Sequence, residues 1–209
     1  MKKHIELIYK ILIVIITGIG LYLNFDLFSF DGGIIYFTIQ SSLLCFLFYL
    51  ITVILIISNK LKKNNFYYIF KGVATMAITI TMFVYQFLLA PNGVELYEHH
   101  FFTSEIVHLA IPILIILDYF LFAEKGNIKK TYPLYWCSPL FVYLVFVIIY
   151  SLCGGTFNGE RVPYFFLDIK EIGFLKVLIY CFMITIFYIG CGHLAFIIDN
   201  KLSKKNENL

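Results

Sequence analysis

Charged residues are scarce in this chain. Only 14% of its 209 residues are Asp, Glu, Lys or Arg, whereas 61% are hydrophobic, and the mean hydropathy is +0.87. A soluble domain of this length does not need that many apolar side chains to fill its interior. The composition therefore argues against a soluble globular protein. The net charge is +3. Membrane topology accounts for the distribution of the lysines, as shown below, so this charge does not indicate nucleic-acid binding.

The sequence contains several long apolar stretches with almost no charged residues. About 20 apolar residues in a helix that rises 1.5 Å per residue span the hydrocarbon core of a bilayer. Six such runs predict transmembrane helices over about residues 5–23, 34–58, 68–89, 102–122, 133–153 and 174–198. The connections between them are too short for an extramembrane domain. We therefore expect residues 1–209 to form one all-α domain, a polytopic six transmembrane helix bundle.

The basic residues are unevenly distributed among the predicted connections between the spans. Most occur at the N-terminus, in or near the second and fourth connections and in the C-terminal tail, while the first and third connections have acidic residues but no Lys or Arg. The fifth connection contains Arg161 and Lys170, which are balanced by three acidic residues. Cytoplasmic connections of membrane proteins are enriched in Lys and Arg. This pattern predicts that both termini are cytoplasmic. The bias toward Ile, Phe, Lys, Asn and Tyr is typical of an AT-rich genome. We expect an integral membrane protein, and the resemblance to six-helix bacterial proteins described below implies the bacterial cytoplasmic membrane.

Polar residues inside the predicted spans gather at one depth. Thr38 lies about five residues into the second helix and His108 about six residues into the fourth, while Tyr85 and Gln86 are similarly close to the outer end of the third. All of them fall in the outer half of the membrane. An ionisable residue within a membrane segment is a candidate functional residue, because its burial there is costly. His108 is therefore the strongest single candidate.

The second helix carries a stripe of small and polar residues at three- and four-residue spacing: Thr38, Ser41, Ser42, Cys45 and Tyr49. Such residues usually face the interior of a helix bundle. They also serve as packing points between membrane helices, so the stripe alone permits a purely structural interpretation. Gln40 lies on another face of the same helix.

A meeting of the second and fourth helices would bring a hydroxyl and an imidazole together. Threonine is a weak nucleophile until a base takes its proton, and neutral histidine can act as that base. The pattern then predicts a catalytic Thr38 and His108. Gln86, Tyr85 and Ser42 are candidate donors to an oxyanion. Glu105, one helical turn from His108, either orients the imidazole or faces the water at the membrane interface.

Three segments in this order carry a family resemblance: "YFTIQ" at the start of the second helix, "EIVHLAIPILIILDYF" in the fourth, and "RVPYFFLDIKEIG" before the sixth. Together they resemble the androgen-induced integral-membrane threonine hydrolase family and its six-helix bacterial relatives. The resemblance implies a membrane lipid esterase that hydrolyses fatty-acid esters of hydroxy fatty acids without a cofactor, with Thr38 and His108 as the essential residues. Gln86 and the order Pro163–Tyr164 depart from the family pattern. These departures do not affect the expected fold, but they mean that the family's substrate range does not transfer directly to this chain.

Metal and haem sites are the first rival class. The candidate ligands near the third connection are Glu95, Glu98, His99, His100, Glu105 and His108. A di-iron bundle would need a second Glu-x-x-His on another helix, which the sequence lacks. A haem needs two facing histidines at one depth, whereas His193 is predicted near the inner end of its helix. The five cysteines follow no metal spacing. We therefore expect no metal and no cofactor.

A small-molecule transporter and a non-catalytic membrane scaffold are two further rival classes. Asp118 and Lys71 are charges within predicted spans, as a transport path would require, although an Asp118 bonded to a tyrosine or lysine would have a purely structural role. Arg161, in the fifth connection, is a candidate for binding a carboxylate or phosphate head group, and this aromatic connection is expected to cover the outer mouth of a site. The expected partners are the bilayer and a lipid or fatty-acid ester, and the oligomeric state is open.

Overall fold

A computed structural model describes residues 2–23, 33–92 and 104–207. Regular secondary structure in these ranges is helical, apart from one isolated β-bridge between Phe157 and Glu160. The α-helices are α1 (Lys2–Leu23), α2 (Phe37–Ile57), α3 (Asn65–Val84), α5 (Ile111–Phe122), α6 (Tyr132–Trp136), α7 (Ser138–Leu152), α8 (Ile169–Ile172) and α9 (Phe174–Glu207). The short 3-10 helices are η3 (Ala90–Asn92) and η6 (Phe165–Leu167), and the π-helical turns are η2 (Tyr85–Leu89) and η5 (Ile106–Ala110).

Five segments of the described chain are long and apolar enough to cross a membrane: Lys3–Leu23, Phe37–Ile57, Asn65–Leu89, Tyr132–Leu152 and Phe174–Lys204. A sixth apolar helical segment, Ile106–Phe122, is shorter. These helices indicate an integral membrane protein, which confirms the predicted all-α class. The count of six spans stays a prediction.

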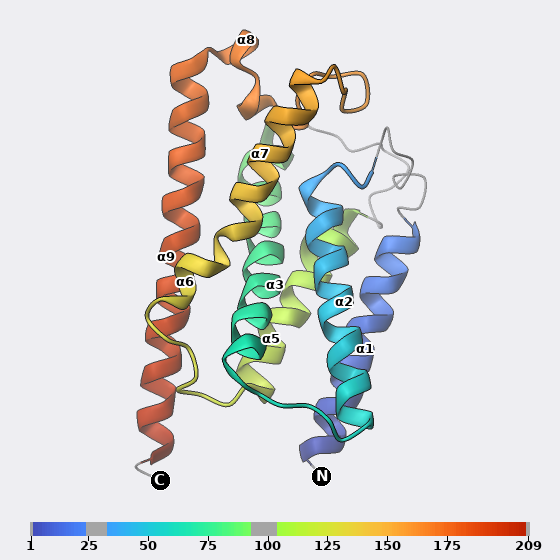
Figure 1. Cartoon of the computed structure of the whole chain (residues 1–209), viewed down its shortest axis with the longest axis vertical. Coiled ribbons are helices and arrows are strands. Elements are labelled where there is room, and N and C mark those ends of the chain that lie inside the picture. The colour runs from blue at the N-terminus through green and yellow to red at the C-terminus, as the bar shows by residue number, and fades with distance from the viewer. Residues whose placement is uncertain (1, 24–32, 93–103, 208–209) are drawn as a thin grey trace.

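The helices run side by side, with α3 in the middle of the bundle (Figure 1). It contacts α2, α5, α6, α7 and α9, while α1 packs on α2 and α5. Both ends of the described chain, the α2–α3 connection and the α5–α6 connection lie at one end of the molecule, which we call the terminal end. The segments η6 and α8 lie at the opposite end, which we call the η6 end.

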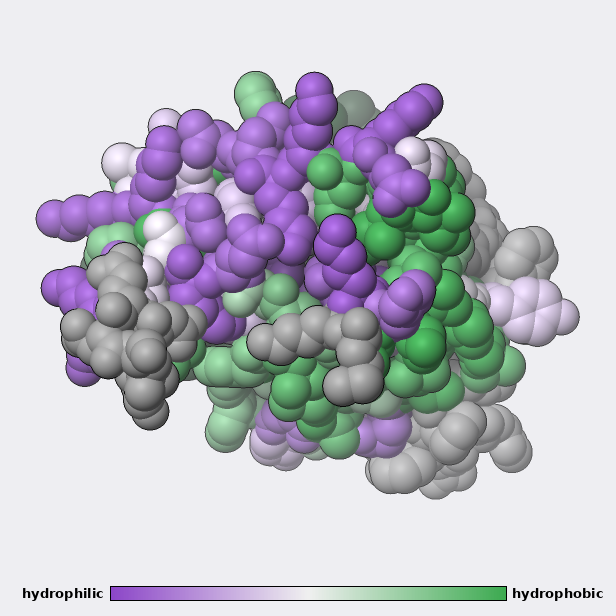
Figure 2. Space-filling view, turned by 90° about the horizontal axis from the view of Figure 1, so that it is seen from below, coloured by the Kyte–Doolittle hydropathy of each residue, from purple (hydrophilic) through white to green (hydrophobic). Residues whose placement is uncertain are grey.

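Hydrophilic residues gather on the terminal end (Figure 2). The exposed lysines at this end come from α1, the α2–α3 and α5–α6 connections and α9, and are Lys3, Lys60, Lys62, Lys129, Lys130, Lys201 and Lys204. Large apolar side chains are exposed along the helices themselves; Leu175 on α9 is 70% exposed and Phe182 66%. Lys170 and Lys176 are exposed at the η6 end, so the terminal end holds most of the exposed lysines but not all of them. Apolar side chains around the bundle and an excess of lysines at one end are the distribution that a bilayer favours.

Several boundaries differ from the predicted ones for local chemical reasons. Helix α3 begins at Asn65 because the side chain of Asn64 accepts a hydrogen bond from the Tyr67 N–H and caps the first turn. The predicted fifth helix is divided into α6 and α7 at Cys137, immediately before the proline-containing start of α7. Proline has no backbone N–H to continue the hydrogen-bond ladder. The last helix extends to Glu207 instead of residue 198.

Each of the two π-helical turns lies just before a proline. In η5, Ile111 N–H donates to the carbonyl of Ile106, five residues back, and Pro112 has no N–H to offer His108. In η2, Ala90 N–H bonds to Tyr85 in the same way, and Pro91 follows. Turns of this kind are rare and often occur at functional sites, because they shift the direction of a side chain.

Candidate functional site

Thr38 and His108 are in contact. Thr38 is the second residue of α2, His108 lies in η5, and the Thr38 Oγ1 and His108 Nε2 atoms are 3.2 Å apart, although 70 residues separate them in the chain. The sequence predicted that both residues lie at one depth, and the tertiary structure brings the two side chains within hydrogen-bonding distance. Only 4% of His108 is exposed.

The hydrogen bonds of His108 determine which nitrogen holds the proton. Its Nδ1 atom lies 2.9 Å from the main-chain carbonyl oxygen of Ser104 and 3.2 Å from the Ser104 hydroxyl. A carbonyl oxygen only accepts, so in the neutral ring Nδ1 carries the hydrogen and donates it. The lone pair is then on Nε2, facing Thr38. This network assigns Thr38 as the donor and His108 as the acceptor, which is the arrangement that general-base catalysis requires.

Tyr85 holds the plane of the imidazole. Its ring stacks on His108 with the centroids 3.8 Å apart and the planes at 15°, and its hydroxyl accepts a hydrogen bond from Ser104 Oγ at 3.1 Å. Tyr85 was predicted as an oxyanion donor, but its hydroxyl is directed at Ser104. The two π-helical turns thus supply both rings of the stack.

Ser41 and Gln40 support the start of α2. Ser41 Oγ donates to the main-chain oxygen of Thr38 at 3.0 Å and lies 2.9 Å from Thr81 Oγ1 on α3. The Gln40 side-chain amide donates to the carbonyl of Ile34 at 3.0 Å, in the turn before the helix. These contacts fix the main chain around Thr38 and tie it to α3, so the polar residues at the start of α2 have a structural role besides any chemistry.

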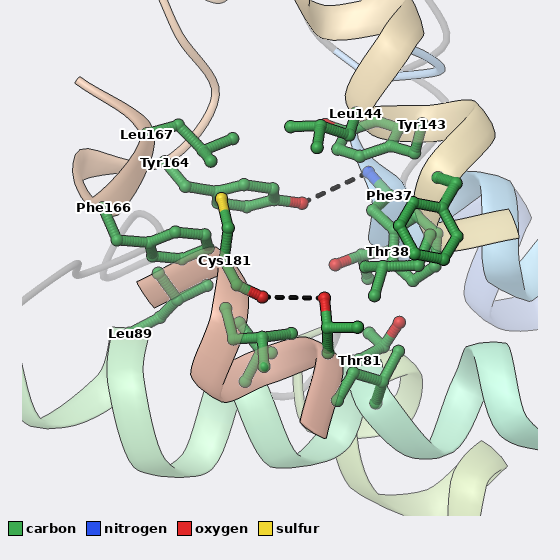
Figure 3. Close-up of a pocket in the computed structure, with 16 residues that line it drawn as sticks. Phe37, Thr38, Thr81, Leu89, Tyr143, Leu144, Tyr164, Phe166, Leu167 and Cys181 are labelled. Atoms are coloured by element: carbon green, nitrogen blue, oxygen red, sulfur yellow. Dashed lines mark hydrogen bonds between the residues drawn. The ribbon is translucent and has the colours of Figure 1, made fainter. Parts of the chain in front are cut away.

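A cavity of about 80 Å³ is lined in part by Thr38, and His108 is not among its lining residues. Its walls come from α2, α3, η2, α7, η6 and α9, and they are mostly aliphatic and aromatic (Figure 3). One wall includes Phe141 of α7, which is 50% exposed and so also borders the outer surface of the bundle. An apolar cavity that borders the lipid-facing surface suits a hydrocarbon chain.

Tyr164 lies across this cavity from the wall that holds Thr38 and Phe37 (Figure 3). Its hydroxyl accepts a hydrogen bond from the Phe37 N–H at 3.2 Å, and Tyr143 and Thr38 lie close to it. Burial raises the pKa of Tyr164 to about 12, although hydrogen bonds with these neighbours oppose the shift. The phenol therefore keeps its proton at neutral pH and is available as a donor.

Tyr164 was not among the site residues predicted from the sequence. The available signal was the aromatic "RVPYFFLDIKEIG" segment, which was expected to cover the outer mouth of a site. Tyr164, Phe166 and Leu167 of this segment do line the cavity.

Three other predicted site residues, Glu105, Gln86 and Ser42, make no described hydrogen bond to Thr38 or His108. Both nitrogens of His108 are occupied by Ser104 and Thr38, and among the described residues Glu105 makes no hydrogen bond to the ring. Within the described chain, no hydrogen bond joins Gln86 to Thr38 or to His108. Ser42 is fully buried, and its hydroxyl has no hydrogen-bond partner among the described residues.

Arg161 does not belong to the cavity. It is exposed, it is not part of the lining, and its main-chain oxygen accepts from Ser151 Oγ at 2.7 Å. Its predicted role in attracting an anionic head group has no support from its position.

Asp118 belongs to a separate cluster toward the terminal end. It is fully buried on α5, and its carboxylate lies 2.5 Å from Lys10 Nζ and 2.7 Å from Lys71 Nζ, with Tyr49 Oη donating at 3.1 Å. Asp118 thus joins α1, α2, α3 and α5. These contacts fit the structural role expected for an Asp118 bonded to tyrosine and lysine, and they do not support Thr38 directly.

No group of three His, Cys, Asp or Glu side chains suited to a metal ion occurs in residues 2–23, 33–92 and 104–207. The candidates Glu95, Glu98, His99 and His100 lie outside the described residues. His193, the second histidine considered for a haem, has Nδ1 3.0 Å from the carbonyl of Ile189 on its own helix.

Comparisons with known proteins give no match, whether to a protein-family model, to a curated protein or to a solved structure. The resemblance to the threonine hydrolase family therefore stays an expectation from short motifs.

Proposed function

We propose that this protein is an intramembrane hydrolase of lipid esters, with Thr38 as the nucleophile and His108 as the general base. The main support is the 3.2 Å contact between Thr38 Oγ1 and His108 Nε2, combined with the bond from Nδ1 to the Ser104 carbonyl. A hydroxyl, a base and a group that orients the base are the three parts of an activated nucleophile.

The reaction follows from these positions. His108 Nε2 takes the proton as Thr38 Oγ1 attacks the carbonyl carbon of the ester, and a tetrahedral intermediate forms. When the C–O bond to the alcohol breaks, the imidazolium gives that proton to the leaving oxygen and the acyl group stays on Thr38. A water molecule then gives a proton to His108 Nε2 and attacks the acyl carbon. As the bond from that carbon to Thr38 Oγ1 breaks, the imidazolium returns the proton to Oγ1, which releases the carboxylic acid and restores Thr38 and neutral His108.

Tyr164 is the proposed donor to the oxyanion. Its phenol keeps its proton at neutral pH and lies on the cavity side of Thr38, where a substrate carbonyl would approach. A donor positioned toward developing negative charge in an apolar site is worth a large part of the rate enhancement. Ser42, which has a buried hydroxyl without a described partner, is the second candidate.

The substrate class rests on the cavity and on the resemblance. The mostly apolar lining accepts an acyl chain that enters from the lipid between α7 and α9. Fatty-acid esters of hydroxy fatty acids, or similar lipid esters, match the family that the motifs resemble. With six spans and the lysine-rich terminal end in the cytoplasm of a bacterial cell, Thr38 would lie in the outer leaflet half of the membrane.

Labelling with a fluorophosphonate probe tests the nucleophile. The purified full-length protein in detergent should gain one adduct, and peptide mapping should find it on Thr38. Thr38→Ala should abolish labelling, Thr38→Ser should keep it, and His108→Gln should slow it by about 10³-fold or more, because the hydroxyl loses its base.

Two matched variants control for general damage. Thr52→Ala removes another buried threonine of α2, whose hydroxyl donates to the Phe48 carbonyl, and His193→Gln removes the histidine of α9; both should label like the wild type. Absence of any adduct on monodisperse wild-type protein, together with no hydrolysis in a screen of lipid esters, would refute the enzyme and favour a non-catalytic scaffold or a transporter.

A further inference from the structure

A second cavity, of about 250 Å³, is lined mainly by α3, α5 and α9 and shares no lining residue with the cavity beside Thr38. It is elongated along the bundle. Its lining residues on α3 recur at intervals of about one helical turn from Tyr68 to Phe83, a distance of about 22 Å at helical rise. The hydrocarbon of a bilayer is about 30 Å thick, or about 15 Å for each leaflet. The cavity therefore has the length and the direction of a lipid acyl chain.

Most of the wall of this cavity is aliphatic or aromatic. Phe120 on α5 and Leu194 on α9 belong to the lining and are also 49% and 56% exposed, so each of them borders both the cavity and the outer surface of the bundle. An apolar cavity of about 150 Å³ holds one benzene ring, so this larger one has room for about ten carbon atoms. A ligand that reaches it from the bilayer would fill it with hydrocarbon.

Two of the three charged residues of the lining, Lys71 and Glu124, have partners of opposite charge within the protein. Lys71 Nζ lies 2.7 Å from the Asp118 carboxylate. Glu124 is bonded to Lys63 Nζ at 3.0 Å and to the Tyr68 hydroxyl at 3.3 Å. A charged ligand group would have to displace these contacts, which is unfavourable in a partly desolvated site. The cavity itself therefore suits the apolar part of a ligand.

Asp199, the third charged residue, holds the α5–α6 connection against α9. It accepts hydrogen bonds of 2.9 Å from the N–H groups of Gly126 and Ile128 in that connection, and a third of 2.9 Å from the Tyr119 hydroxyl. At Gly126 the approach is close, since an added Cβ would lie 2.5 Å from Ser203 Oγ of α9. Tyr119, Ile128 and Asp199 all belong to the lining. The connection and the last turns of α9 thus meet at the terminal end of the cavity.

Three exposed lysines lie next to this meeting point. Lys129 directly follows the lining residue Ile128, and Lys130 is the next residue. Lys201 comes seven residues, or about two helical turns, after Leu194 and therefore lies on the same edge of α9 as that lining residue. Within the described chain, none of the three forms a salt bridge with a carboxylate. Their positive charge remains available for an anion.

Exposed cations at the end of an elongated apolar cavity fit an amphiphile with a long chain and an anionic head. Anionic phospholipids are the amphiphiles of this kind that a bilayer supplies, and basic pockets at the ends of membrane helices bind their head groups. Lysine is a common phosphate ligand.

We propose that this cavity binds an acyl chain of an anionic phospholipid, whose phosphate is bound by Lys129, Lys130 and Lys201. The chain enters beside Phe120 and Leu194 and runs along α3. This site is independent of the proposed hydrolase chemistry, because it uses no residue of the cavity beside Thr38.

Trp136 is the sole tryptophan of the chain and belongs to the lining, so its fluorescence reports on this cavity. Phosphatidylglycerol with brominated acyl chains, titrated into the full-length protein in detergent micelles and excited where only tryptophan absorbs, should quench the emission saturably. Phosphatidylcholine with the same brominated chains has a zwitterionic head and should reach half-quenching at a mole fraction about tenfold higher or more. Unbrominated phosphatidylglycerol should reverse the quenching.

Two triple variants locate the head group. The variant Lys129→Gln, Lys130→Gln, Lys201→Gln should remove most of the difference between the two lipids. The matched control changes three other exposed lysines of the terminal end, from segments that contribute no residue to this lining: Lys3→Gln, Lys60→Gln and Lys62→Gln. It removes the same charge from the protein and should keep the preference for phosphatidylglycerol.

Variants on α9 separate the cavity from bulk lipid. Ala195→Phe places a ring in the cavity, whose lining includes Ala195, and should raise the half-quenching mole fraction of phosphatidylglycerol about tenfold or more. Ile197→Phe adds a ring on the same helix at an exposed residue outside the lining and should change little. Ala195→Leu repeats the test with a smaller side chain, and circular dichroism and elution volume check the fold of all three.

Thr38→Ala should bind both lipids like the wild type, so this test and the hydrolase test can fail independently. Equal quenching by the two lipids, or a control triple variant that loses the preference as well, would overturn the binding of an anionic head by these lysines. Quenching that rises linearly with lipid, or that Ala195→Phe and Ala195→Leu leave unchanged in folded protein, would show bulk lipid contact and overturn the cavity site. Ionised oleate that displaces the brominated lipid as well as phosphatidylglycerol does would assign the site to a fatty acid instead.

Discussion

Two polar clusters inside this bundle differ in the charge of the groups that form them. The cluster at the η6 end, around Thr38 and His108, consists of hydroxyls, an imidazole and a phenol, and it adjoins an apolar cavity. The cluster around Asp118 consists of full charges, and each of its central groups is paired at 2.5 to 2.7 Å. Among helices of similar composition, one cluster places a hydroxyl–imidazole pair next to a cavity, and the other surrounds its carboxylate with two ammonium groups and a tyrosine.

This difference separates the proposed function from stability. A buried carboxylate held by two ammonium groups and a tyrosine is neutralised by its neighbours, and it fixes the helices that contribute to it. A hydroxyl bonded to a neutral imidazole has a small net interaction and can exchange its partner for a substrate. The position of a polar residue in a membrane helix is therefore less informative than what its partners leave unsatisfied.

Removing Asp118 should have the largest effect. Asp118→Asn deprives Lys10 and Lys71 of the buried counter-ion that they share, which costs about 3–5 kcal/mol. We expect loss of the monodisperse protein or a large drop in Tm, measured by size-exclusion chromatography and thermal unfolding in detergent. The triple variant Lys10→Met, Lys71→Met, Asp118→Leu should recover most of the stability. An unchanged Tm for Asp118→Asn would contradict the structural role.

Tyr164→Phe should reduce catalysis while sparing the fold. The variant keeps the ring stacked on Phe166 and removes the phenolic donor, so we expect kcat for a lipid ester to fall about 100-fold with little change in KM. Tyr150→Phe, in a ring that packs on Phe157 outside the cavity, is the matched control. Equal kcat values for the two variants would exclude Tyr164 as the oxyanion donor.

Ser104 and Glu105 give a smaller effect that tests which one orients His108. Ser104→Ala removes a hydroxyl from Nδ1 but keeps the main-chain carbonyl, so kcat should fall about 3- to 10-fold. Glu105→Gln should change kcat less than about twofold, because Glu105 makes no described bond to the ring. Both values come from the same esterase assay, and a larger loss in Glu105→Gln would reverse the assignment.

Lys125, at the terminal end, should give the smallest effect. Burial lowers the pKa of Lys125 to about 8 from 10.5, and Lys71 lowers it further while Asp199 and Asp118 oppose the shift. Between these two pH values the unfolded chain binds more protons than the folded one, so folding stability should rise as the pH increases from 8 to 10.5.

The measurement is Tm against pH for the wild type and Lys125→Met, and the difference between the two curves isolates this group. Between pH 8 and 10.5, the Tm of Lys125→Met should increase less than that of the wild type, by a difference on the order of 1 °C. Parallel curves would mean that the lysine is better solvated than its position beside the Tyr119 ring suggests.

Much of the helical fold was predictable, because a bilayer requires long apolar helices and these are visible in the sequence. The errors have local causes. The cap at Asn64 moved the start of α3, and the proline after Cys137 divided the fifth helix. The π-helical turns were not foreseen, since a proline indicates a disturbed ladder but not the form that the disturbance takes.

The candidate site was predictable only in part. The predicted membrane depth and helix face identified Thr38 and His108 as candidates, and the folded structure places their side chains in contact. Glu105 was the candidate for orienting the ring because side-chain charge is visible in a sequence, whereas the main-chain carbonyl of Ser104, which lies next to Nδ1 in the folded chain, is not. Tyr164 was missed because its contact with Phe37 spans 127 residues.

Hydropathy and helical spacing are local properties, so the amino-acid sequence alone indicates an all-helical membrane protein with polar residues at the start of α2 and in the fourth apolar segment. Which of those residues meet, which carboxylate is already neutralised and which buried donors lack a described acceptor became visible in the folded chain. These features depend on the packing of helices far apart in the chain, and a linear pattern does not specify the distances between them.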